Sequence, residues 1–418
     1  MNIKLRWVVL ILFILIIGVP AFSQSANGES GVITSISISG LKRTKLHVAE
    51  NPLRRFVGQE AASLDTDQVR AVVLDTGILE PLLVEIRDAA AETAGEKILF
   101  IEVREKWAIF PVPVFFIGSG SMLAGAAFYD ANAFGLNQKM AVAGMYQTGG
   151  WIATALYMVP PDSAGSFGWI ANVLYIESER RDGNQKNETL RRFNTRSVSA
   201  GGILQYRFTE TLTGAFRLSY MNVQLRDTAA PLLAPPEGAQ VISMAPEFSA
   251  RRSSWDGYLL SEESASIGYT FVQGFPSPSV HSLSLRGVYE KSILPGFRTN
   301  FRFGLLYKNE APLLFESGPH EAAVNILPSS FSARHYAGLS LGLEKYLFRF
   351  SFGTVSALGS WQMAWSNGPL LGDSFDYGVM GSLFFYMSRL AIPAMGFGLA
   401  YNIPAEYFQF SFSIGMSL

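Results

Sequence analysis

The sequence predicts a mainly β protein, in which a small α+β domain precedes a transmembrane antiparallel β-barrel of about 16 strands. Hydrophobic residues make up 49% of the 418 residues, yet beyond the N-terminal segment no apolar run is as long as the roughly 20 residues of a membrane-spanning helix. Glycine and aromatic residues are frequent. From Trp107 onward, segments of about ten alternating residues recur, as in strands that face lipid on one side and water on the other.

The first residues are typical of a signal peptide. Lys4 and Arg6 form a basic start, residues 7–19 are apolar, and small residues follow at Ala21 and Ser23. Residues 1–23 are therefore expected to direct export and to be cleaved, with an uncleaved membrane anchor as the alternative. An exported chain with lipid-compatible strands belongs in the cell outer membrane, with its N-terminal domain in the periplasm.

Residues 31–106 differ from the rest of the chain and are expected to fold as one α+β domain. A β-branched run ends at Gly40, and Asp65 or Thr66 can cap a helix whose apolar stripe begins at Val69. The expected order is strand, helix, helix, strand, strand, at residues 32–38, 47–56, 66–76, 82–86 and 98–103.

Two short motifs flank this domain. Residues 36–44 read ISISGLKRT in the first strand, and residues 101–106 read IEVREK at the end of the last strand. With the element order, these motifs resemble a POTRA domain. The resemblance implies a periplasmic docking module with a strand edge that accepts an extended client or a periplasmic partner. A spacer that only positions the barrel is the alternative.

The last segment of the chain shows the clearest barrel pattern. Phe408, Phe410 and Phe412 alternate with small or polar residues, so one face of the strand suits lipid and the other suits the lumen. A soluble sandwich core is the alternative way to bury such a stripe. An open sheet edge in lipid leaves amides unpaired, so the barrel of residues 107–418 is expected to close. The expected strands are residues 109–116, 123–128, 138–146, 151–159, 168–176, 196–208, 212–223, 242–254, 265–272, 282–289, 299–307, 336–348, 349–365, 377–387, 394–402 and 408–418.

Charged clusters at residues 177–182 and 251–263 are expected in water-facing loops. A longer segment without alternation, residues 311–335, precedes the last five expected strands. Arg334 and His335 end this segment, and Tyr336 begins the next strand. Residues 129–135 read YDANAFG and contain an Asn-x-Phe-Gly turn. Together with the POTRA-like unit, these features resemble the BamA/TamA family of outer-membrane assembly and translocation barrels. Members of that family carry a long loop before the twelfth strand, and its Arg-Gly-aromatic tip folds into the lumen.

By this resemblance, Arg334 would be the arginine at the loop tip, with Tyr336 as its aromatic neighbour and Glu344 as its partner in the lumen. Two departures stand out. His335 replaces the usual glycine, and Ala357 stands where the family has a second acid. The alternative for Arg334 is a solvated loop charge. A second Arg-Gly pattern, in residues 285–289, lies inside an expected strand with no long loop before it and ranks lower.

The first and last expected strands meet at a seam. Pro111 and Pro113, which follow Ile109, lack N–H donors and thin the hydrogen-bond ladder there. The resemblance implies an insertase, a translocase or an accessory assembly factor that acts on unfolded outer-membrane or secreted protein clients in contact with outer-membrane lipids. A two-partner secretion pore for a dedicated substrate and a porin-like structural barrel are the alternatives.

Catalytic chemistry is not expected. The chain has no cysteine, its four histidines lack the spacing of a metal site, and no nucleophile elbow or phosphate loop occurs. His281 beside Ser282 is the one faint candidate for a lipase-type pair. The net charge of −1 argues against nucleic-acid binding. We therefore expect no enzyme activity, no metal and no cofactor.

Overall fold

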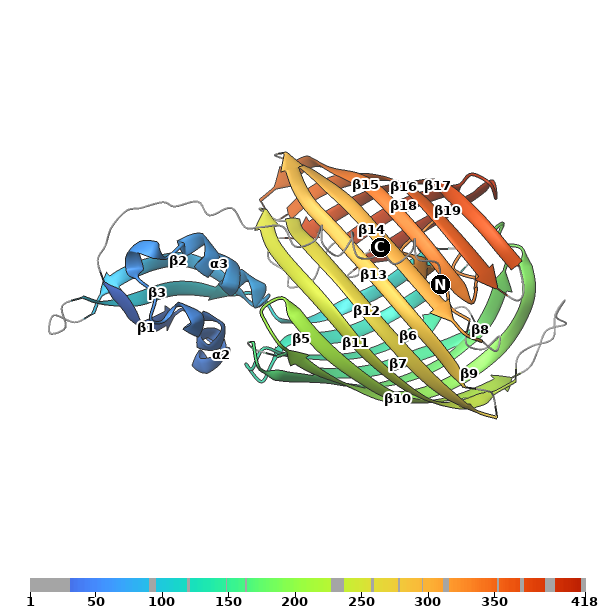
Figure 1. Cartoon of the computed structure of the whole chain (residues 1–418), viewed down its shortest axis with the longest axis horizontal. Coiled ribbons are helices and arrows are strands. Elements are labelled where there is room, and N and C mark those ends of the chain that lie inside the picture. The colour runs from blue at the N-terminus through green and yellow to red at the C-terminus, as the bar shows by residue number, and fades with distance from the viewer. Residues whose placement is uncertain are drawn as a thin grey trace, which may run out of the picture.

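The computed structural model describes residues 31–89, 95–118, 121–147, 149–161, 164–226, 237–256, 259–276, 279–294, 296–310, 316–351, 353–368, 372–387 and 395–414. These residues form an N-terminal domain and a barrel that lie end to end (Figure 1). The expected signal peptide, residues 1–23, and residues 415–418 of the expected last strand lie outside the described residues. Among the helices of the described residues, none has the length and apolar character that a membrane crossing requires.

The N-terminal domain has the predicted strand-helix-helix-strand-strand order. Its elements are β1 (Val32–Ser39), α2 (Leu46–Glu50), η1 (Asn51–Phe56), η2 (Ala61–Ser63), α3 (Thr66–Asp75), β2 (Leu79–Asp88) and β3 (Glu96–Glu105). The sheet order is β1-β3-β2, with β1 parallel and β2 antiparallel to β3. As predicted, Asp65 caps α3, because its carboxylate accepts a hydrogen bond from the Asp67 N–H.

One apolar core holds this domain together. The helical stripe that includes Val69 and Val73 packs with Leu53 against Leu99 and Ile101 of the central strand, and all five side chains are buried. Strand β3 therefore alternates between core-facing and outward-facing residues, as a half-buried strand should.

The barrel has sixteen strands, each antiparallel to the next, and β19 returns to β4 to close it. The predicted strand number, order and fold class are confirmed. The strands are β4 (Ile109–Gly118), β5 (Ser121–Ala133), β6 (Gln138–Gln147), β7 (Gly150–Val159), β8 (Phe167–Gly183), β9 (Thr189–Arg207), β10 (Leu212–Arg226), β11 (Ala239–Asp256), β12 (Leu259–Phe275), β13 (Val280–Leu294), β14 (Phe297–Lys308), β15 (His335–Phe350), β16 (Gly353–Gly368), β17 (Gly372–Met387), β18 (Met395–Asn402) and β19 (Tyr407–Ile414).

Two hairpins of the barrel are longer than predicted. Residues 177–182 lie in β8 and residues 251–256 and 259–263 lie in β11 and β12, so the expected charged loops are strand extensions. Opposite charges face each other across these hairpins, as in the ion pairs Arg192–Glu179 at 3.1 Å and Arg251–Glu262 at 2.9 Å. Cross-strand pairing lets charged residues stay in strands beyond the apolar belt, which local polarity alone does not reveal.

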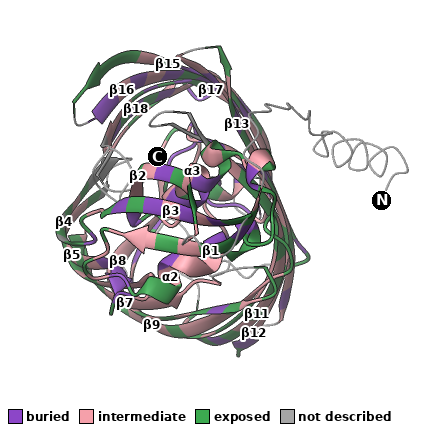
Figure 2. Cartoon of the chain, turned by 90° about the vertical axis from the view of Figure 1, so that its left-hand side faces the viewer, coloured by how far each residue is buried: buried purple, intermediate pink, exposed green. Residues whose placement is uncertain are grey.

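The N-terminal domain lies in front of one mouth of the barrel (Figure 2). We call this the domain end of the barrel and the opposite mouth the far end. At one side of the domain end, both guanidinium nitrogens of Arg43 bond the carboxylate of Asp130, at 2.6 and 3.1 Å. At another side, Arg55 lies 3.5 Å from Glu210 in the turn between β9 and β10.

The contact at Asp130 is a rigid joint. Asn132 donates a hydrogen bond to the Thr44 hydroxyl at 2.9 Å, and Gly135, with a positive φ of 73°, lies so close that a Cβ atom would overlap the Arg43 carbonyl. From the other side, the Glu105 carboxylate accepts backbone N–H groups of residues 42–44. The YDANAFG turn singled out in the sequence is thus the part of the barrel that holds the N-terminal domain.

Substituting Asp130→Asn should loosen this joint. The change removes a nearly buried carboxylate from a charged bidentate contact, which we expect to cost about 1–3 kcal/mol. Limited trypsin digestion should then cleave the segment around Lys106 faster than in the unmodified protein. As a control, Glu80→Gln removes the exposed pair with Arg104 and should leave the cleavage rate unchanged. Equal rates in both variants would contradict a rigid joint.

Candidate functional site

The long segment between β14 and β15 folds back into the barrel. Ala322, Ile326 and Phe331 in this segment are buried, and they form one apolar cluster with Met380 on β17 and Ala400 on β18. We call residues 316–334 the lumenal loop. Its position inside the barrel agrees with what the family resemblance implied.

Two opposed glycines make room for this loop. Gly304 on β14 pairs with Gly338 on β15. A Cβ atom at Gly304 would overlap the Glu321 carbonyl oxygen, and one at Gly338 would overlap the Ala322 carbonyl oxygen. The loop backbone can therefore lie directly on the wall only because both positions lack a side chain.

Polar contacts fix the loop on the wall. Tyr336 donates its hydroxyl hydrogen bond to the Ser317 carbonyl at 2.8 Å, and the Asn325 N–H donates to Gln362 at 2.7 Å. Glu321 forms an ion pair with Arg286 on β13. Burial by itself raises the pKa of Glu321, but hydrogen bonds from His320 and Arg286 outweigh it and hold this pKa well below the ordinary 4.5. This ion pair thus joins an acid of the lumenal loop to an arginine of strand β13.

The predicted loop-tip residues lie elsewhere. The backbone N–H of Arg334 donates to the Asn367 carbonyl at 2.9 Å, next to the start of β15. His335 is the first residue of β15 and stacks on Tyr307 with ring centroids 4.7 Å apart. Tyr336 is buried and turned inward. Arg334 is therefore not the tip of the loop, and a histidine at 335 fits because the backbone there is an ordinary strand.

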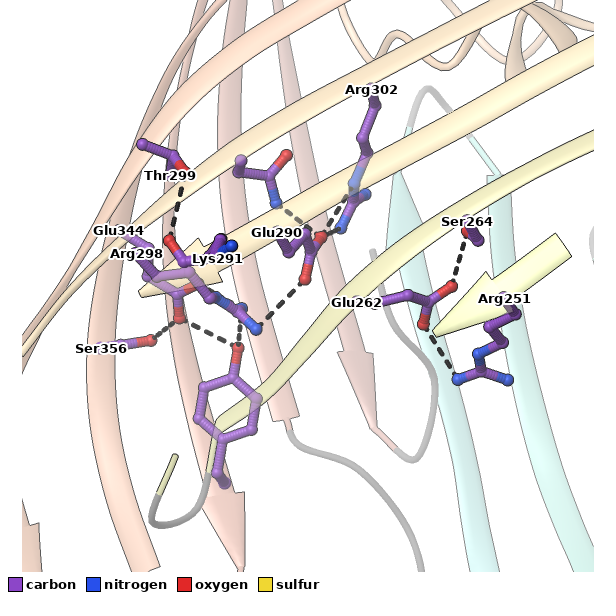
Figure 3. Close-up of polar contacts among 12 residues, drawn as sticks. Arg251, Glu262, Ser264, Glu290, Lys291, Arg298, Thr299, Arg302, Glu344 and Ser356 are labelled. Carbon is purple, nitrogen blue, oxygen red and sulfur yellow. Dashed lines mark hydrogen bonds and ion pairs between the residues drawn. The ribbon is translucent and has the colours of Figure 1, made fainter. Parts of the chain in front are cut away.

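Glu344 pairs with a different arginine from the predicted one. Arg298 faces Glu344 across β14 and β15, and its Nε lies 3.0 Å from the carboxylate (Figure 3). Glu344 is ten residues beyond Arg334 on the same extended strand, about 30 Å away at the rise of a strand, so the Arg334–Glu344 pair is ruled out. The register between β14 and β15 determines which arginine faces Glu344, and this register cannot be predicted from the sequence alone.

This pair is the centre of a buried polar network near the domain end. Arg298 also lies 3.1 Å from Glu290, which in turn contacts Arg302 at 2.8 Å. Tyr386 donates a hydrogen bond to Glu344 at 3.0 Å, and Ser356 contacts the same carboxylate. Five strands, β13 to β17, are thereby tied together on the lumenal side, which makes this part of the barrel rigid.

In contrast to this tightly bonded network, the seam between β4 and β19 has few contacts. Among the described residues, two residue pairs join these strands, Ser411 with Gly118 and Phe412 with Ile117. On their other edges, β19 pairs over eight residues with β18 and β4 pairs over ten with β5. Residues 109–116 of β4, including Pro111 and Pro113, have no partner on the seam side among the described residues.

Outer-face aromatic residues cross this seam. Phe115 and Phe412 have ring centroids 6.2 Å apart, and Phe412 also lies against Phe397 at 4.6 Å. Phe408 and Phe410 point to the same outer face and are exposed, as are Ile109, Pro111 and Pro113. Apolar side chains thus cover the outside of a strand pair that has few backbone hydrogen bonds.

At the far end, the hairpin of β8 and β9 reaches the lumenal loop. The Gly183 N–H donates to the Ser330 carbonyl at 2.9 Å, and Asn187 bonds both the Ser330 hydroxyl, at 2.9 Å, and the Tyr407 hydroxyl, at 3.1 Å. Arg191, fully buried, pairs with Asp182 in the same hairpin. No sequence pattern predicts this contact, which links β8, the lumenal loop and the start of β19.

Neither a known protein-family profile nor a curated protein matches the sequence. Solved structures do match. BamA from Haemophilus ducreyi lacking POTRA domains 1–3 is 15% identical with a TM-score of 0.52, over 93% of this chain and 84% of that one. CdiB from Acinetobacter baumannii is 13% identical with a TM-score of 0.62, over 92% and 73%. CdiB from Escherichia coli is 11% identical with a TM-score of 0.61, over 92% and 77%. The chain therefore shares the fold of these barrels.

Removing the central arginine of the buried network should strongly destabilise the barrel. Arg298→Met leaves Glu290 and Glu344 without their shared cation, which we expect to cost about 3–5 kcal/mol of unfolding free energy. Urea unfolding followed by tryptophan fluorescence measures this change. The control Arg251→Met breaks an exposed pair and should cost at most about 1 kcal/mol. Similar losses in the two variants would contradict the network.

Acid should loosen the lumenal loop. Because the pKa of Glu321 is lowered from 4.5 to about 2 in the folded protein, its ionised form favours docking at neutral pH, and this contribution is lost as the pH falls from about 4.5 toward 2. Planar-bilayer recordings should then show more frequent conductance events in acid than at neutral pH. Arg286→Gln should show such events already at neutral pH. Recordings that are the same under all three conditions would contradict the role of this ion pair.

Proposed function

We propose that this protein is an outer-membrane insertase, translocase or accessory assembly factor that acts on unfolded protein clients through the seam between β4 and β19. The observation that carries the proposal is that, among the described residues, these strands share two residue pairs, whereas every other pair of neighbouring barrel strands shares eight or more. The shared fold with BamA and CdiB barrels supports it.

Opening the seam costs little compared with opening any other strand pair. Among the described residues, fewer backbone hydrogen bonds break when this two-pair ladder opens than when any other strand pair of the barrel does. The β4 edge at residues 109–116 can then pair with an extended client strand, which supplies the hydrogen bonds that lipid cannot. Pro111 and Pro113 keep the barrel's own ladder short without removing the carbonyl acceptors.

The N-terminal domain is suited to receive the client. In this proposal residues 31–106 are a POTRA-type docking module in the periplasm, held at the mouth by the Arg43–Asp130 contact. Among the described residues, the outer edge of β2 has no strand partner, whereas the outer edge of β1 is bonded at Ile33 to the backbone of residues 58 and 59. Leu82 on the β2 edge is exposed and offers an apolar contact to an extended segment.

A dedicated secretion pore or a porin would need a continuous lumen. The lumenal loop and the β8–β9 hairpin meet inside the barrel through Gly183 and Ser330, and the loop fills the space beside β14–β18. This arrangement favours a lateral route over passage from mouth to mouth. A secretion pore would require this loop to leave the lumen.

A disulfide across the seam tests the proposal. Because the chain has no cysteine, Gly118→Cys with Ser411→Cys gives one defined crosslink between the paired positions of β4 and β19. Oxidation should abolish the assembly of client barrels by the purified protein in liposomes, and a reductant should restore it. Assembly is read from the protease resistance of added unfolded barrel proteins.

The matched control crosslinks a fully paired hairpin. Ser219 and Ser243 face each other on β10 and β11 with hydroxyls 2.6 Å apart, so Ser219→Cys with Ser243→Cys should form a disulfide that leaves client assembly unchanged. If the seam crosslink left assembly at the control rate, the lateral route would be excluded.

A further inference from the structure

The lumenal face beside the seam is apolar, whereas barrel lumens are normally polar. On β6, β7 and β8 the side chains of Val142, Trp151 and Val173 are exposed on the outer face, so the residues between them face the lumen. Opposite positions on paired strands share a face, which extends this assignment to β5 and β9. We call the resulting surface the apolar wall: Leu123, Ala127, Ala141, Ala143, Met145, Ile152, Leu156, Met158, Ile170, Leu174, Ile176 and Ile203.

The opposite side of the lumen is built differently. There Ser340, Ser356 and Gln362 point inward and are buried, because the lumenal loop and the polar network cover them. Every residue of the apolar wall, by contrast, keeps intermediate exposure. Thr154 and Asn172 are the polar residues within it, and Thr154 is satisfied by the Val173 carbonyl. The apolar wall is therefore open to the lumen across the described residues.

The apolar wall runs from the seam to a polar cavity. Its first strand, β5, is the neighbour of β4, so one strand separates the apolar wall from the seam. At its other end Ile203 also lines a cavity of about 300 Å³ with Arg217, Glu247 and the ion pair Arg286–Glu321. An apolar surface thus connects the bilayer to a polar space inside the barrel.

One row of the wall matches the shape of a lipid. Met158, Ile170 and Ile203 lie opposite one another on β7, β8 and β9, between Lys139 on β6 and Arg217 on β10. Four strand spacings make this row about 19 Å long, comparable with an extended acyl chain. Arg217 is exposed in the cavity, and among the described residues no carboxylate lies within ion-pair distance of it. Its guanidinium suits a phosphate group.

We propose that the apolar wall binds an acyl chain of an anionic glycerophospholipid that enters from the bilayer through the seam, with its phosphate at Arg217. When an acyl chain covers these side chains, it removes their apolar surface from the water in the lumen. This contributes roughly 25 cal/mol of binding free energy for each Å² covered. An unfolded polypeptide gains less binding free energy from such a surface than an acyl chain does, because its backbone groups lose hydrogen bonds to water there. This lipid site does not depend on the client proposed above.

Photolabelling tests the site directly. The full chain in liposomes receives phosphatidylglycerol with a diazirine near the end of one acyl chain, and labelled peptides are mapped by mass spectrometry. Label should appear on Met158 and Ile170 in the lumen as well as on outer-face residues such as Val173, which serve as the internal standard. Label confined to the outer face, or lumenal crosslinks to a polypeptide in place of lipid, would overturn the proposal.

Two variants of one residue separate binding from folding. Ile170→Asn places a polar side chain where barrel lumens tolerate one, and Ile170→Trp fills the space with apolar bulk. Each should lower lumenal label by about fivefold relative to the outer-face label, because roughly 1 kcal/mol of apolar contact is lost or blocked. The control Ser219→Asn, a lumenal change outside the wall, should leave the ratio unchanged. Unchanged ratios in both Ile170 variants would exclude the wall.

The headgroup and the route are tested separately. Arg217→Gln should lower the preference for phosphatidylglycerol over phosphatidylcholine, and Lys139→Gln should not. The reverse result would overturn the assignment of the phosphate to Arg217. Labelled lipid added after oxidation of the seam disulfide should leave the lumen unlabelled. Lumenal label at the uncrosslinked rate would exclude the seam as the route.

Discussion

Every backbone amide of a strand in lipid needs a hydrogen-bond partner, and this constraint shapes the whole molecule. It forces the sixteen strands to close, and fifteen of the sixteen junctions between neighbours are long ladders. The remaining junction, between β4 and β19, has two residue pairs among the described residues and two prolines nearby. Aromatic side chains on the outer face, among them Phe115 and Phe412, cover the seam where hydrogen bonds are few. The weak junction is therefore part of a complete barrel rather than an open edge.

The two sides of the lumen have opposite character. Beside β14–β18, two opposed glycines let the lumenal loop lie on the wall, and the network around Arg298 ties the strands together. On β5–β8 and at Ile203 of β9, the lumenal face is mostly apolar, and no described residue of the lumenal loop is buried against it. A barrel that is rigid on one side and yielding at a seam on the other can open laterally without losing its fold. The N-terminal domain, fixed at Asp130 on β5, is attached close to the yielding side.

Features that repeat along the chain were predictable, and features that depend on distant contacts were not. Alternation in each strand is local, so sixteen strands and the β-α-α-β-β domain followed from the sequence. The charged stretch at residues 177–182 resembled a loop because its cross-strand partners lie elsewhere in the chain. The partner of Glu344 depends on strand register, which placed Arg298 rather than Arg334 opposite it. The paired glycines Gly304 and Gly338 were the one sequence signal of the loop's docking surface, and only the register brings them together.

Hydrogen–deuterium exchange of the protein in a lipid bilayer tests the weak seam most directly. Alternate residues of β4 point toward β19, and two of these positions, Pro111 and Pro113, have no amide. Peptides that cover Ile109–Gly118 should therefore show a fast-exchanging fraction of about a third of their amides. Peptides that cover the central part of β10, which is paired on both edges, should show almost none. Equal and complete protection of β4 and β10 would mean that the barrel is closed by a full ladder, and the account of a yielding seam would fail.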